Sequence, residues 1–65
     1  MSLEKIDGLR SLIDSLRTEY EKFEGKNNAV AGTRARKILQ DIKSVAQELR
    51  ETIQERKRQK EMLGD

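Results

Sequence analysis

Hydrophobic residues in the first third of the chain recur at alternating spacings of three and four. The row consists of Ile6, Leu9, Ile13, Leu16, Tyr20 and Phe23. Because an α-helix has 3.6 residues per turn, this spacing places the side chains on one stripe of a helix. The row predicts a helix over residues 3–24. Gly25 would follow it in the left-handed backbone conformation that commonly ends a helix.

A second row with the same spacing occupies the second half of the chain. It consists of Ala31, Ala35, Ile38, Ile42, Val45 and Leu49, and a further row of Leu39, Ala46 and Ile53 runs beside it at intervals of seven. These rows predict a helix over residues 29–62 whose apolar stripe is too broad to be covered by one neighbouring helix. Either the further row covers the edge of a two-helix contact, or it packs against a second copy of the chain.

The segment 25–28, Gly-Lys-Asn-Asn, separates the two rows and is typical of a turn in which Asn27 or Asn28 caps the second helix. So short a connection makes the helices antiparallel neighbours. The sequence therefore predicts an all-α fold: one domain over residues 1–65 that forms an antiparallel, coiled-coil-like two-helix hairpin. We expect its core to contain Ile13, Leu16, Ile38, Ile42, Val45 and Leu49.

The predicted helices differ in length. At 1.5 Å per residue the first spans about 33 Å and the second about 50 Å. We therefore expect the chain after about Thr52 to extend beyond the hairpin.

Composition favours self-association. The chain has 65 residues, 40% of them charged, and no Cys, His or Pro. A domain of this size buries only about 60% of the surface that its unfolded chain exposes, and small domains usually need disulfides, a metal or a partner. We expect a homodimer or higher oligomer in which hairpins form a four-helix bundle through Leu39, Ala46 and Ile53.

The same composition argues against catalysis. A general acid or base needs a shifted pKa, which requires burial or a coupled charge in a pocket, and every carboxylate here falls on a polar helical position. We expect no enzymatic activity, no small-molecule substrate, no metal and no cofactor. No apolar run reaches the roughly 20 residues of a membrane span, and no signal peptide is visible. A cytoplasmic location without a membrane partner is therefore expected.

Positive charge gathers in the second half of the chain, with five basic and six acidic residues in 1–28 but nine basic and six acidic in 29–65. The predicted main nucleic-acid contact, at the start of the second helix, consists of Lys26, Thr33, Arg34, Arg36 and Lys37. The predicted auxiliary contact, at the end of this helix, consists of Arg56, Lys57, Arg58 and Lys60. A helix start favours phosphate through its free N–H groups and its dipole. The alternative is that both clusters are ordinary solvated side chains.

Several short motifs span much of the chain: Phe23, Gly-Lys-Asn-Asn-Ala at 25–29, Ala-Gly-Thr-Arg-Ala-Arg-Lys at 31–37, Ile-Lys at 42–43 and Ala-Gln-Glu-Leu-Arg at 46–50. Over about residues 6–56 the chain resembles bacterial linker-histone-like (histone-one-like) DNA-binding proteins. The resemblance implies a nucleoid-associated protein that binds double-stranded DNA with little sequence preference and compacts it. Several members of this family carry a Lys/Ala-rich C-terminal tail, and this sequence resembles a short form without it.

Two functions remain open at this point. The first is a homo-oligomer that binds DNA through phosphates, which needs no residues that read bases. The second is a structural or adaptor module whose apolar face docks helices of another protein, an alternative that a net charge of only +2 leaves open. A polybasic contact with a membrane surface is a weaker third hypothesis, because the end of the second helix lacks a large apolar face.

Overall fold

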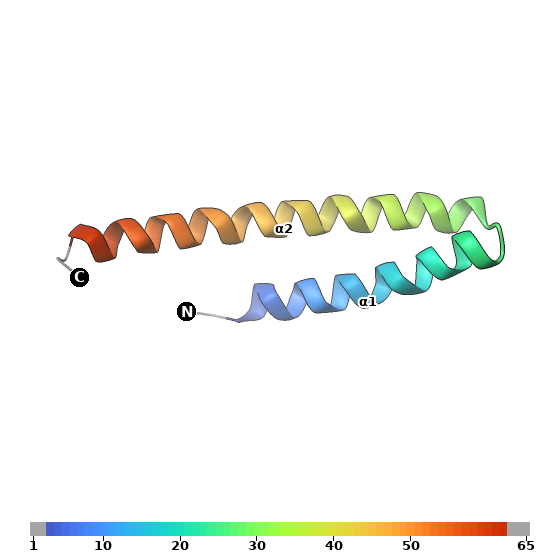
Figure 1. The fold of residues 1–65 in the computed structure, drawn as a ribbon, viewed down its shortest axis with the longest axis horizontal. Helices are drawn as coiled ribbons and strands as arrows, with labels where there is room; N and C mark the ends of the chain where they lie inside the picture. The colour runs from blue at the N-terminus through green and yellow to red at the C-terminus, as the bar shows by residue number, and fades with distance from the viewer. Residues whose placement is uncertain (1–2, 63–65) are drawn as a thin grey trace.

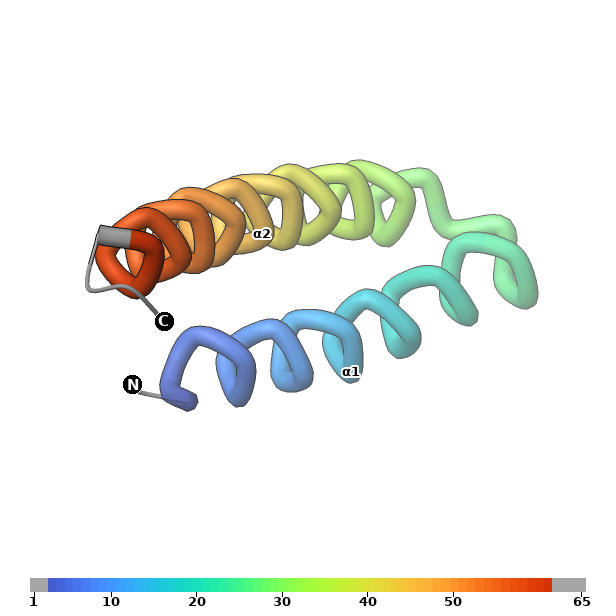
Figure 2. Tube along the Cα trace, turned by 60° about the vertical axis from the view of Figure 1, so that its left-hand side comes forward, coloured from blue at the N-terminus to red at the C-terminus, as the bar shows by residue number. Residues whose placement is uncertain are grey.

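The computed structural model describes residues 3–62, which form two α-helices joined by a short connection (Figure 1). Helix α1 spans Glu4–Gly25 and helix α2 spans Ala29–Met62. The two helices run antiparallel and side by side in both ribbon views (Figures 1 and 2), and the described residues contain no strand. The expected all-α helical hairpin is confirmed.

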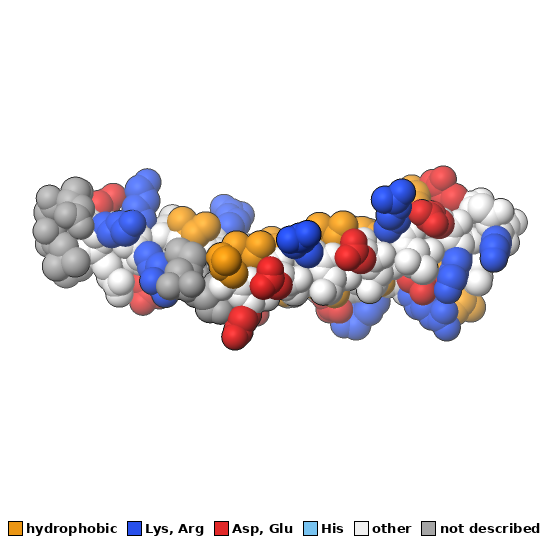
Figure 3. All heavy atoms as spheres, turned by 90° about the horizontal axis from the view of Figure 1, so that it is seen from below, with side chains coloured by type: hydrophobic (Ala, Val, Ile, Leu, Met, Phe, Trp, Pro, Cys, Tyr) orange, Lys and Arg blue, Asp and Glu red, His pale blue; other side chains and the backbone are white. Residues whose placement is uncertain are grey.

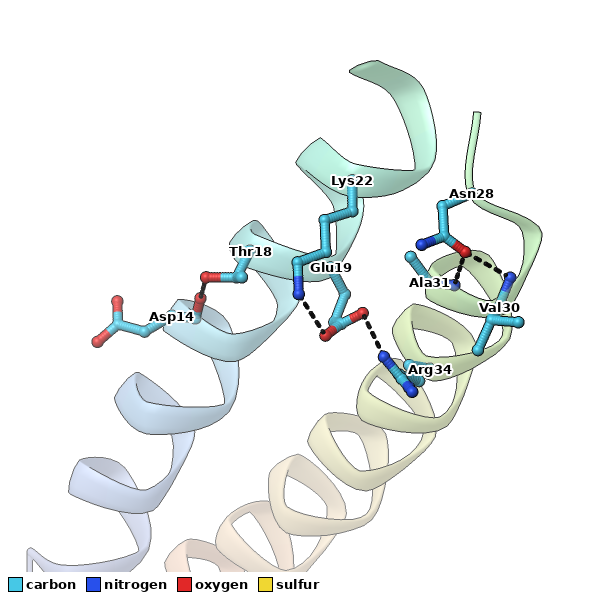
Figure 4. Close-up of polar contacts among 8 residues, drawn as sticks. All are labelled: Asp14, Thr18, Glu19, Lys22, Asn28, Val30, Ala31 and Arg34. Carbon is cyan, nitrogen blue, oxygen red and sulfur yellow. Dashed lines mark hydrogen bonds and ion pairs between the residues drawn. The ribbon is translucent and has the colours of Figure 1, made fainter. Parts of the chain in front are cut away.

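Asn28 starts α2. Its side-chain oxygen accepts hydrogen bonds from the backbone N–H groups of Val30 (3.0 Å) and Ala31 (3.2 Å), which have no carbonyl partner within the helix (Figure 4). Of the two candidate caps, Asn28 is therefore the one that the structure uses.

The chain reverses at Asn27 and not at Gly25. Helix α1 continues through Gly25, and the N–H of Lys26 still donates to the carbonyl of Lys22 at 3.1 Å. Asn27 holds the left-handed conformation, with φ of 53°. The expectation for Gly25 was wrong because asparagine also tolerates this region and so allows the helix to run further.

The helices meet along a narrow seam. On α2, Ala31 and Ala35 are the buried hydrophobic residues of the described chain. Larger side chains of the seam are only partly buried, namely Leu9, Leu12 and Leu16 on α1 and Ile38, Ile42, Val45 and Leu49 on α2. A single hairpin therefore has little core of its own, and much of its apolar surface remains in water.

The seam uses a different side of α1 from the one expected. Ile13, predicted as a core residue, is 52% exposed, and Leu12 is turned toward α2 in its place. Leu9 and Leu16 belong to both candidate stripes, so the alternating spacing left two sides of the helix open. Helix α2 packs on the side that contains Leu12 and Glu19.

Helix α2 is 34 residues long and α1 is 22, so the second helix continues past the start of the first (Figure 1). A common groove is lined by the first turn of α1 and by the α2 residues Leu49, Thr52, Ile53 and Arg56. Beyond this groove α2 runs on to Met62, and every side chain from 54 to 61 is exposed.

Candidate nucleic-acid interface

Part of the predicted main contact is already engaged with carboxylates. Lys37 forms an ion pair with Asp41, one turn further along α2, at 2.9 Å. Arg34 reaches across to Glu19 of α1, with 3.9 Å between Nη1 and Oε2. The Lys37–Asp41 pair is exposed, and such pairs contribute about 0–1 kcal/mol, so a phosphate can replace Asp41 at small cost.

Glu19 is an exception among the carboxylates. Its side chain is only 15% exposed and lies in the seam between Lys22 and Arg34 (Figure 4). Its Oε2 atom is buried without a hydrogen-bond partner. The expectation that every carboxylate falls on a polar position was therefore wrong for Glu19, because the seam runs along the side of α1 to which it belongs.

The other members of the predicted main contact lie near the turn. Lys26 and Arg36 are exposed and form no ion pair within the described residues. The Thr33 hydroxyl donates to the carbonyl of Ala29 at 3.4 Å, which leaves its oxygen free to accept but not to donate. A phosphate offers only acceptors at neutral pH, so Thr33 has to give up this bond to assist.

The predicted auxiliary contact lies at the far end of α2. Its four members, Arg56, Lys57, Arg58 and Lys60, are exposed, and none has an ion-pair partner in the described part of the chain. Arg36 and Lys57 are 21 residues apart on one helix, a separation of about 30 Å. The structure does not bring the two predicted clusters together.

Two residues outside both predicted clusters connect them. Arg36, Lys43, Arg50 and Lys57 recur at intervals of seven, and we call them the basic row. Residues seven apart drift by only about 20° around a helix, so the four lie on one side of α2. All are exposed and none forms an ion pair within the described residues. The interval of seven was visible in the sequence, whereas the two clusters were chosen by adjacency.

A hydrophobic surface lies on one side of the hairpin. Leu39 and Ile53 of α2 are 49% and 57% exposed, and Ile6, Ile13 and Tyr20 of α1 are exposed as well. Ile6 and Ile53 line the same groove, so the two rows border the same side. We call these five residues together with Ala46 the apolar side. Hydrophobic side chains recur along much of the molecule in the view of Figure 3.

Tyr20 carries a polar group within the apolar side. Its hydroxyl forms a hydrogen bond with Glu24, and this bond, the charge of Glu24 and desolvation raise the pKa of Tyr20 above its ordinary value.

Family comparison decides what kind of hairpin this is. The model of the family described as histone H1-like protein Hc1 matches residues 3–59. The chain belongs to the histone H1-like Hc1 family. This confirms the resemblance that the motifs indicated. Comparison with curated proteins and with solved structures gave no match.

The Hc1-family hairpin separates its charges around α2. Asp41, Glu48 and Glu55 each stand two positions before a member of the basic row. Positions two apart on an α-helix point about 160° away from one another, so the acidic and basic side chains face nearly opposite directions. Glu48 reaches Lys5 of α1 at 3.0 Å. The three carboxylates are thus turned away from the basic row, on a side of α2 that also carries Arg34 and Lys37.

Residues 3–62 of this Hc1-family chain include no helix with the length and hydrophobicity needed to cross a bilayer. The family is one of histone-like proteins and not of enzymes. The arrangement thus offers two kinds of surface, a basic one suited to a polyanion and an apolar one suited to another helix.

Proposed function

We propose that this Hc1-family hairpin is a nucleoid-associated protein that binds double-stranded DNA with little sequence preference, through phosphate contacts. Beyond family membership, the observation that supports this proposal is the excess of unpaired cations on α2. The side chains concerned are Arg36, Lys43, Arg50, Arg56, Lys57, Arg58 and Lys60. Ion pairs within the described chain leave these charges available to an external anion.

The mechanism is electrostatic. Each Lys or Arg that neutralises a phosphate releases condensed counterions, which makes binding strong at low salt and independent of sequence. Helix α2 has no aromatic residue, so it offers no platform on which unpaired bases could stack. At one end of the hairpin the phosphate contacts come from Lys26, Arg34, Arg36 and Lys37, with Thr33. At the other end they come from Arg56, Lys57, Arg58 and Lys60.

We also propose that the protein acts as a homo-oligomer, at least a dimer, in which hairpins pair through the apolar side. Pairing would cover Leu39, Ala46 and Ile53 together with the exposed row on α1, and it would double the number of phosphate contacts per particle. Joining two hairpins in this way would allow one particle to contact two DNA segments and so compact the chromosome. The same surface supports a second candidate function, an adaptor that docks the helices of another protein.

Fluorescence anisotropy with labelled duplexes of unrelated sequence, at several salt concentrations, tests the DNA proposal. Affinity should fall with salt with a slope of about −0.9 per phosphate neutralised, and equally for each sequence. The double variant Arg34→Ala/Arg36→Ala should bind more weakly with a shallower slope, whereas Lys5→Ala/Lys22→Ala on α1 should change little. If the unmodified protein does not bind at low salt, the adaptor function is supported instead.

A further inference from the structure

We propose that the basic row, Arg36, Lys43, Arg50 and Lys57, is a continuous track along α2 that binds phosphates of a DNA duplex. This inference rests on the proposed DNA binding and goes beyond it, because it assigns the middle of the helix to the interface. Lys43 and Arg50 become phosphate ligands. The two basic ends then belong to one extended site.

Spacing supports the track. Members of the row are about 10.5 Å apart along the helix axis, and the whole row spans about 30 Å. A duplex rises about 3.4 Å per base pair, so neighbouring cations are about three base pairs apart along its axis. Because each strand winds once around this axis in about ten base pairs, a straight row meets phosphates of both strands in turn. The row therefore matches about nine base pairs, close to one turn of the duplex.

The two flanks of the row carry no negative charge between Arg36 and Arg50, whereas Glu61 lies one turn beyond Lys57 and lines a hollow with it. One flank consists of Gln40, Gln47 and Gln54, and the other of Leu39, Ala46 and Ile53. Asp41 and Glu48, each two positions before a member of the row, point to the other side of α2, and Glu51 is about 100° around the helix from Arg50. At physiological salt a charge is screened over about 8 Å, so the local sign matters more to an approaching phosphate than the net charge.

The surface along the row repeats in structure as well as in sequence. Arg36, Leu39, Gln40 and Lys43 line one shallow hollow, and Arg50, Ile53, Gln54 and Lys57 line another. The second set is the first displaced by 14 residues, with two cations, one amide and one aliphatic side chain in each. Both cations and the amide can donate hydrogen bonds to phosphate oxygens. Thr33 and Lys37 also line the first hollow. Two hollows that repeat this set of four side chains on one line suit a polymer with regularly repeated charges better than a single small anion.

The track and the apolar side lie next to each other without coinciding. Leu39 and Lys43, like Ile53 and Lys57, differ by one helical turn, and they line the same hollows. A second copy of the chain can therefore pack on the apolar side while the ammonium and guanidinium groups of the basic row remain accessible at the edge of the contact.

The deciding variant is Lys43→Gln/Arg50→Gln, which removes the two middle charges and leaves both predicted ends intact. Lys5→Gln/Lys22→Gln is the matched control, because it removes the same charge from side chains that form ion pairs away from the row. Anisotropy titrations across a salt series should show that the track variant loses tenfold or more in affinity at 0.1 M salt. Its salt slope should be shallower by about 1.8, since about 0.9 is lost per phosphate contact.

Two further measurements separate the outcomes. The charge-retaining variant Lys43→Arg/Arg50→Lys should bind within about twofold of the unmodified protein, and circular dichroism should show the same helix content for all variants. Duplexes of 6, 9 and 12 base pairs should show affinity that rises up to about nine base pairs, the length of the row. Equal binding by the track variant and the control overturns the track while DNA binding stands. Failure of the unmodified protein to bind any duplex overturns the proposed function itself.

Discussion

Two glycines inside the helices have opposite surroundings. A Cβ added at Gly8 would meet nothing within 4 Å, whereas one added at Gly32 would lie 2.7 Å from Cδ1 of the Phe23 ring. Gly8→Ala should therefore raise the free energy of unfolding by about 1 kcal/mol, the difference in helix propensity. Gly32→Ala should lower it by about 1 kcal/mol, because displacing the ring costs more than the propensity gain.

Urea denaturation of the two variants measures this contrast. Gly8→Ala serves as the control, since it makes the same chemical change without a steric conflict. If Gly32→Ala proved as stabilising as Gly8→Ala, the close approach of the helices beside Phe23 would be disproved.

Glu19 is a mostly buried carboxylate in the seam whose charge is poorly compensated. Its Oε2 atom is buried without a hydrogen bond, and its two cationic neighbours are 3.8 and 3.9 Å away. Replacing a poorly satisfied buried charge with an apolar side chain of similar size is often stabilising. Glu19→Leu should raise the melting temperature, and the free energy of unfolding should increase by about 1–2 kcal/mol.

The control for this prediction is Glu21→Leu on the outer surface of α1. Glu21 pairs only with the exposed Arg17, so its replacement should change stability by less than about 0.5 kcal/mol. A loss of stability in Glu19→Leu would show that the carboxylate holds the helices together.

At the scale of the elements, the side of α1 that faces α2 can be tested by truncation. Leu12 is partly buried in the seam, whereas Ile13 is 52% exposed. Leu12→Ala should therefore destabilise the hairpin by about 1–2 kcal/mol more than Ile13→Ala, in proportion to the apolar surface lost. Thermal unfolding at concentrations where the protein sediments as a monomer measures the difference. A larger loss at Ile13 would restore the seam predicted from spacing.

The two helices, the turn and their antiparallel arrangement could be predicted from the sequence, because 3.6-residue periodicity and a Gly-Asn-rich break are local signals. The seam could not. Leu9 and Leu16 belong to two overlapping stripes, and only the packing of α2 shows that Leu12 and Glu19 lie inside. The two clusters of the candidate site were chosen because their cations are adjacent in sequence. This criterion missed Lys43 and Arg50, which the helix brings into line with them.

The end of α2 should be the most dynamic part of the described helices. Residues 57–61 continue past the groove shared with α1 and their side chains are exposed, so this part of the helix is stabilised by backbone hydrogen bonds without packing. Hydrogen exchange of these amides should be much faster than that of residues 38–49, and bound DNA should slow it. Equal protection in both segments without DNA would indicate that a second chain covers the end of α2.

For the whole molecule, self-association is the property to measure first. The variant Leu39→Asp or Ile13→Asp places a charge in the apolar side. Either change should shift the sedimenting species from dimer or higher oligomer to monomer at tens of micromolar protein. Val30→Asp is the matched control, because Val30 is also exposed, at 57%, but lies outside the apolar side. A monomeric mass for the unmodified protein would contradict the proposed assembly.

The position of the basic row on one side of α2 also has a kinetic consequence. A rod whose unpaired positive charges lie along one side has a dipole moment perpendicular to its long axis, although its total charge is only +2. The field of a DNA molecule exerts a torque on such a dipole and turns the positive side inward before the surfaces touch. A larger share of collisions is then productive, and this gain fades as added salt shortens the range of the field. The placement of the charges, more than the net charge, thus determines the rate at which this small protein associates with DNA.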